Sequence, residues 1–201
     1  MKLMLRAAVP LALGLAVGGC SVSSLLGGGG KPPATLQTLT PETPDPGPAT
    51  RAVSAGQAVT IGTPAIPKEL RTTRVPVQVT PTDIQYVTDL QWVDTPDRLF
   101  QDLVAETVRR TTNRVVLDTH QTALDPGLLV SGELQRFGYD SSSGQVVVVY
   151  DALLSSGSQV QSRRFTASAP ADGSGSSVGP ALNRAANQVA QEIAQWIGSV
   201  S

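Results

Sequence analysis

Residues 128–169 read LLVSGELQRFGYDSSSGQVVVVYDALLSSGSQVQSRRFTASA, and this stretch decides the fold class. It contains three segments rich in aliphatic residues, at 128–139, 145–154 and 160–169. The short polar stretches DSSSG and SSGS separate them, and such stretches are typical of hairpin connections. The pattern therefore predicts three strands that form an antiparallel meander.

The side-chain pattern adds two details to this meander. In the first strand Leu134 lies in phase with the earlier apolar residues, whereas Phe137 and Tyr139 fall on the other face, which predicts a bulge near Gln135. In the second strand the four consecutive valines at 146–149 predict a strand that is buried on both faces.

Helical patterns lie on either side of the meander. Upstream, Asp94 or Thr95 can cap a helix with Pro96 at its first position, and apolar residues recur at helical spacing to about Arg110. Downstream, a second helix is expected from Pro180 to about Ile197, ended by Gly198. Its apolar stripe consists of Leu182, Ala186, Val189, Ile193 and Ile197.

Shorter strands are predicted at 35–40, 58–62, 74–80, 84–93 and 114–118. Pro76 lies inside the third of these and indicates an edge strand or a bulge, because proline cannot donate a hydrogen bond to a neighbouring strand. The whole pattern predicts an α+β fold, with a mostly antiparallel sheet and two helices packed on one face.

The first twenty residues, MKLMLRAAVPLALGLAVGGC, have the pattern of a secretory signal, with a charged start and an apolar run too short to span a bilayer. The ending Val-Gly-Gly-Cys is similar to the bacterial lipobox, in which the cysteine is acylated and becomes the first residue of the mature protein. We therefore expect a lipoprotein signal peptide at 1–19, lipidated Cys20 with a flexible GGGGKPP tether at 20–33, and one domain at 34–201. The alternative is that Cys20 is a chance cysteine in a signal peptide cleaved elsewhere.

Composition and motifs argue against most chemical sites. The net charge is −1 and aromatic residues make up 4% of the chain, so no basic surface for nucleic acid is expected. His120 is the only histidine, and no second ligand at suitable spacing supports a metal site; no metal or cofactor is expected.

Ser177 lies in a G-x-S-x-G sequence, which in some hydrolases carries the nucleophilic serine after a strand. Here the residues before Ser177 form a Ser/Gly loop, and His120 precedes it in the chain, so we interpret Ser177 as a helix cap. A glycosidase pair is left open among the carboxylates Asp89, Asp94, Asp97 and Asp102.

A run of features along the chain resembles the ABC-type transport auxiliary lipoprotein family. The resemblance begins with IPKEL at 66–70 and continues with LQWVDTPDRLFQDLV at 90–104. It departs from the family pattern near Leu36 or Gln37, where an aromatic residue is expected. The matching positions are Trp92, Pro96, Leu99, Leu103, Phe137, Arg163, Arg164, Phe165 and Trp196.

The resemblance implies a non-catalytic periplasmic lipoprotein subunit of an ABC/MCE-type system that moves lipids or hydrophobic solutes and supports membrane integrity. The implied partners are an ABC permease and an MCE-domain protein, with the ATPase reached indirectly; a homo-oligomer is possible. Ser21 is not the aspartate that retains many lipoproteins at the inner membrane, which favours an anchor at the periplasmic face of the outer membrane. The alternatives are an envelope structural or assembly lipoprotein unconnected to a transporter, and an anchored enzyme.

Overall fold

The structure is a computed structural model that describes residues 35–48, 50–52, 54, 56–117 and 127–200. These residues form two helices, a seven-stranded sheet and one 3-10 turn, η2 (Lys68–Leu70). The helices are α1 (Pro96–Thr111) and α2 (Gly175–Ser199). The strands are β1 (Val59–Ile61), β2 (Arg74–Gln78), β3 (Ile84–Gln91), β4 (Val116–Leu117), β5 (Leu128–Asp140), β6 (Gln145–Ser156) and β7 (Gln159–Pro170).

The sheet is mixed, so the prediction of a mostly antiparallel sheet is wrong, although the α+β class is confirmed. The meander β5-β6-β7 is antiparallel, as is the pair β2-β3. The pairs β1-β4, β1-β5 and β2-β5 are parallel. The parallel pairs join strands that are distant in the chain, and a parallel pair needs a long crossover connection that carries no local hairpin signal.

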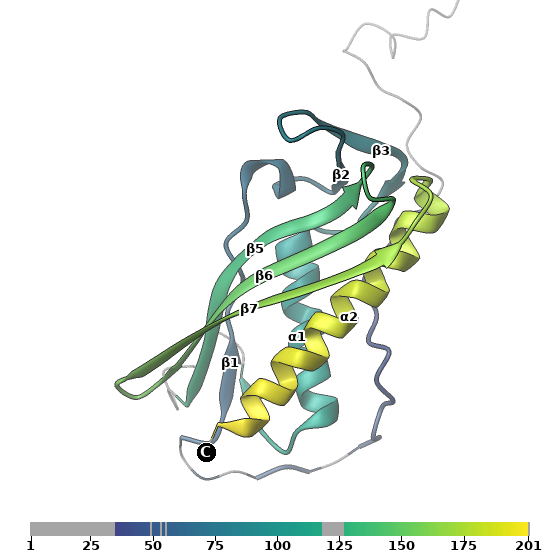
Figure 1. Cartoon of the computed structure of the whole chain (residues 1–201). Coiled ribbons are helices and arrows are strands. Elements are labelled where there is room, and N and C mark those ends of the chain that lie inside the picture. The colour runs from purple at the N-terminus through teal and green to yellow at the C-terminus, as the bar shows by residue number, and fades with distance from the viewer. Residues whose placement is uncertain (1–34, 49, 53, 55, 118–126, 201) are drawn as a thin grey trace, which may run out of the picture. The chain divides into compact units, whose positions relative to one another are not determined.

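Both helices pack on the same face of the meander, as the sequence predicts. On β6 and β7, Tyr150 and Phe165 are cross-strand partners and point to the same side. The ring of Tyr150 contacts Phe100 of α1 at 5.2 Å between centroids, and Phe165 contacts Trp196 of α2 at 5.6 Å. Figure 1 shows the long α2 running beside the sheet with α1 next to it. The hydrophobic core therefore lies between this face and the two helices.

The opposite face of the meander has no helix on it among the described residues, and this corrects the prediction for the four valines. Val146 and Val148 are fully buried, whereas Val147 and Val149 are only half-buried. A strand with one covered face alternates in this way, so a run of valines does not by itself indicate burial on both faces.

Two predicted bulges are present. The β5-β6 register shifts between Leu134 and Arg136, where the phase of the apolar side chains predicted it. The β2-β3 register shifts between Arg74 and Pro76. β2 is nevertheless not an edge strand, because it pairs with β3 on one side and β5 on the other. A Cβ on Gly138 of β5 would overlap the Pro76 carbonyl oxygen, so glycine is needed for this close approach.

Several boundaries differ from the prediction. α2 begins at Gly175 rather than Pro180, so Pro180 lies inside the helix, and α2 ends at Ser199, one residue beyond Gly198. The predicted strand at 35–40 is reduced to one bridge between Gln37 and Trp92. No helix in the described part of the chain is long and apolar enough to cross a membrane.

Candidate functional site

The predicted acylation site, Cys20, lies outside the described residues, as do the tether at 20–33 and the only histidine, His120. The described part of the chain begins at residue 35, directly after the tether. We therefore take the residues that first attach this end of the chain to the folded domain as the candidate functional site. We call residues 36–47 the strap.

The strap first joins the sheet. Gln37 donates its backbone N–H to the Gln91 carbonyl at 2.9 Å, and its own carbonyl accepts from the N–H of Val93 at 2.8 Å. The Gln37 side chain lies against Gly179 of α2, where a Cβ would overlap it. The start of the strap is thus fixed between the end of β3 and the first turns of α2.

The strap then binds α2 through two asparagines. The Asn183 Oδ1 accepts from the Thr40 N–H at 2.8 Å, and the Asn187 Oδ1 accepts from the Glu42 N–H at 2.8 Å. The Asn187 amide also donates to the Thr40 carbonyl at 2.9 Å. Asn187 is 1% exposed. A buried amide is stable only when its polar atoms are paired, and here the strap backbone provides most of that pairing.

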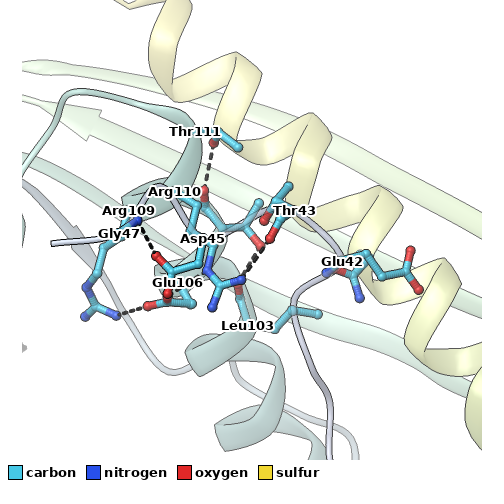
Figure 2. A network of polar contacts seen from close by, with 11 residues as sticks. Glu42, Thr43, Asp45, Gly47, Leu103, Glu106, Arg109, Arg110 and Thr111 are labelled. Carbon is cyan, nitrogen blue, oxygen red and sulfur yellow. Dashed lines mark hydrogen bonds and ion pairs between the residues drawn. The ribbon is translucent and has the colours of Figure 1, made fainter. Parts of the chain in front are cut away.

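The far end of the strap binds α1 (Figure 2). Arg110 donates from one terminal nitrogen to the Thr43 carbonyl at 2.8 Å and from Nε to Glu106 at 2.8 Å. Arg109 donates to the other oxygen of Glu106 at 3.3 Å. The hydrogen bond from Arg110 is the main cause that lowers the pKa of Glu106, and Arg109 adds to it. The strap is therefore fastened to the sheet and to both helices.

The strap contacts were not predicted, although the sequence contains one indication of them. Asn187 is a polar residue close to the apolar stripe of a helix, and such a residue needs a buried partner. Arg110 lies at the predicted end of the first helix. Its bond to Thr43 joins residues 67 positions apart, which no local pattern indicates.

Of the residues considered for catalysis, the structure describes Ser177 and the four carboxylates, whereas His120 lies outside the described residues. Ser177 lies in the first turn of α2, and its hydroxyl accepts from the Asp172 N–H at 3.2 Å, so it is a turn residue at the helix start. The N-cap itself is Ser174. The carboxylates Asp89, Asp94, Asp97 and Asp102 lie on β3 and at or in α1. Within the described ranges, no three His, Cys, Asp or Glu side chains gather as a metal site would require.

A model of the ABC-type transport auxiliary lipoprotein component matches residues 38–194, which covers most of the chain and nearly the whole described fold. The chain belongs to this family. The match includes residues 38–47 of the strap, all of α1, all seven strands and α2 as far as residue 194. It confirms the resemblance drawn from the sequence and assigns the protein to auxiliary lipoproteins of ABC-type transport. No curated protein sequence matches the chain.

Solved structures of other proteins are similar to this chain. Protein XCC0632 from Xanthomonas campestris is similar with a TM-score of 0.66 and 21% identity, over 82% of this chain and 95% of that one. A further, uncharacterized protein is similar with a TM-score of 0.59 and 15% identity, over 74% and 96%. A dodecamer of PelC from Paraburkholderia phytofirmans is more distant, with a TM-score of 0.39 and 14% identity, over 71% and 92%. The likeness to the first two structures shows the fold alone.

Proposed function

We propose that the protein is a non-catalytic, outer-membrane-anchored periplasmic subunit of an ABC/MCE-type system that moves lipids or hydrophobic solutes across the envelope and supports membrane integrity. The observation that carries this proposal is the family match over residues 38–194. The lipobox-like sequence that ends at Cys20 supports the anchor, and Ser21 supports the outer membrane. The partners we propose are the ABC permease and the MCE-domain protein, with the ATPase reached indirectly.

The strap supports the anchoring part of the proposal. A fully extended chain from Cys20 to Leu36 reaches at most about 55 Å, which sets how far from its membrane the domain can work. Any pull on the acyl chains reaches the domain through the strap. The strap forms bonds to β3, α2 and α1, so this force is distributed over the sheet and both helices. The domain can therefore stay folded while it is attached to its membrane at one end and bound to a transport partner.

In-cell photocrosslinking tests the proposal. Val160 lies near the tip of the β6-β7 hairpin and is 65% exposed, so a photoreactive amino acid in its place can reach a partner without entering the core. We expect crosslinks to an MCE-domain protein or an ABC permease. The matched control is Val189 of α2, which is fully buried and should give no partner crosslink.

The crosslinked partners separate the proposal from its alternative. Crosslinks from Val160 only to envelope proteins unrelated to a transporter would refute the transport role and favour a structural or assembly lipoprotein. The non-catalytic part is tested by alanine at His120 and Ser177. These changes should leave membrane integrity unchanged, and a folded double variant that has lost envelope function would contradict the proposal.

A further inference from the structure

An open basic pocket lies where the end of the strap meets the end of α1. Its volume is about 390 Å³, within the range of small-molecule sites in proteins. Four of the chain's 15 Lys and Arg residues line it. The lining consists of Arg51, Arg109, Arg110 and Arg114 together with Asp45, Pro46, Gly47, Glu106, Val115 and Val116.

The pocket carries more positive than negative charge. Its two carboxylates leave a formal charge of +2 against the four guanidinium groups. Glu106 is already engaged by Arg109 and Arg110, and Asp45 accepts the Gly47 N–H at 2.8 Å. Among the described residues, no carboxylate lies within ion-pairing distance of Arg51 or Arg114. Within the described ranges, these two cations therefore have no carboxylate partner.

Two of the guanidinium groups are held in place by backbone carbonyls. Arg110 donates to Thr43, and Arg114 donates to the carbonyls of Gln57 at 3.2 Å and of Val200. A guanidinium has five N–H donors, and Arg110 and Arg114 each use two of them in bonds to other described residues, so each keeps three for a ligand. Because both side chains are already ordered by the fold, a ligand that binds them needs little further loss of side-chain entropy.

We propose that the basic pocket binds a phosphate-bearing anion, either a free phosphate or the phosphodiester of a glycerophospholipid headgroup. The planar guanidinium fork matches two oxygens of a phosphate group, and such charge-assisted bonds are among the strongest hydrogen bonds in proteins. Arg109 is exposed and Arg51 is half-buried, so both can adjust to a ligand held by Arg110 and Arg114. The C-terminal dipole of α1 opposes an anion here, so the arginines must provide the attraction. This site does not depend on the proposed transport role.

Calorimetric titration of the full-length lipidated protein in a neutral maltoside detergent tests the proposal. The two probes are sodium phosphate and glycerophosphoglycerol, with sodium acetate as a control for charge alone. The double variant Arg51→Ala/Arg109→Ala removes the two adjustable arginines and leaves the two that hold backbone carbonyls. The matched control is Arg98→Ala/Arg184→Ala, which removes the same charge from exposed positions of α1 and α2.

We expect at least one phosphate probe to bind more tightly than acetate. The pocket double variant should weaken that binding by about tenfold or more, and the control variant should change it by less than about twofold. Binding of glycerophosphoglycerol alone would identify a lipid headgroup as the source, and binding of inorganic phosphate alone would identify a free phosphate. Equal unfolding midpoints of the two double variants without ligand show that the pocket variant is folded.

Two results would overturn the proposal. One is that neither phosphate probe binds at concentrations up to about 10 mM. The other is that the two double variants lose affinity equally, because binding would then follow net charge and not the pocket. If the pocket double variant unfolds, the single variant Arg51→Ala replaces it, since Arg51 makes no hydrogen bond among those found in the described residues.

Discussion

Replacement of Asn187 by alanine removes the central attachment of the strap to α2. The Asn187 amide accepts from the Glu42 N–H at 2.8 Å and donates to the Thr40 carbonyl at 2.9 Å. It also donates to the Asn183 carbonyl within α2 at 2.9 Å. Asn187→Ala therefore leaves two strap backbone groups without their partner, and both of these bonds are part-buried.

The size of the effect follows from these bonds. A hydrogen bond contributes about 1 kcal/mol net, and a buried group that loses its partner adds to the loss, so the two strap bonds represent about 2–3 kcal/mol. Alanine forms helix better than asparagine and offsets about 0.5 kcal/mol. We expect the free energy of unfolding of Asn187→Ala to fall by about 2 kcal/mol. For a domain of this length that corresponds to a melting temperature lower by about 4–8 °C.

Urea unfolding and amide hydrogen exchange measure this loss. The exchange rate at the Glu42 N–H should rise by a larger factor than the rates of core amides in β5 and β6, because its acceptor is gone. Gln188→Ala is the matched control, since Gln188 is the next residue of α2 and is exposed; it should change stability by less than about 0.5 kcal/mol. A stability loss in Asn187→Ala no larger than in this control, with unchanged exchange at Glu42, would refute the idea that α2 holds the strap.

Three further changes have definite expected outcomes. Cys20→Ala should move the protein from the membrane fraction to the soluble fraction, and continued membrane association would contradict acylation at Cys20. Gly138→Ala should cost about 1–3 kcal/mol in urea unfolding because its Cβ overlaps the Pro76 carbonyl, whereas Gly198→Ala, with open space around it, should cost nothing. Hydrogen bonding from Ser142, with Arg136 contributing, lowers the pKa of Asp140 to about 2, so the folded state favours the ionised form. That stability is present above the unfolded pKa of about 4 and is lost as the pH falls toward 2; Asp140→Asn should flatten this part of the pH–stability curve.

The sequence predicted the parts of the fold that depend on near neighbours. The meander, the bulge near Gln135 and α1 came from the periodicity of side chains and from short polar connections, and all are present. Pro76 indicated an edge strand or a bulge, and the structure has the bulge. The positions of the two helices on one face followed from the rule that an amphipathic helix covers the apolar face of a sheet.

The sequence did not predict what depends on distant pairing. β5 lies between β6 on one side and both β1 and β2 on the other, and its parallel bonds to β1 and β2 leave no pattern in any of the three strands. Val147 and Val149 are only half-buried for the same reason. Whether a second layer of structure covers a strand depends on residues distant in the chain, and the sequence of the strand itself does not show it. The strap was missed for a related reason. Its residues 36–47 contain prolines and polar residues that resemble a loop, and the side chains that bind it, Asn183, Asn187 and Arg110, are distant in the chain.

The strap and the basic pocket share Arg110, which couples the anchored end of the domain to the proposed ligand. One terminal nitrogen of this guanidinium group donates to the Thr43 carbonyl, and Arg110 also lines the pocket. A bound phosphate would fix Arg110 more firmly and so hold the end of the strap. By linkage, a ligand that stabilises the fastened strap must bind more weakly when the strap is loosened, by the same factor. Asn187→Ala, which makes no hydrogen bond to a pocket residue, should therefore lower phosphate affinity, and phosphate should slow exchange at the Glu42 N–H. If neither effect is seen, the strap and the pocket are independent.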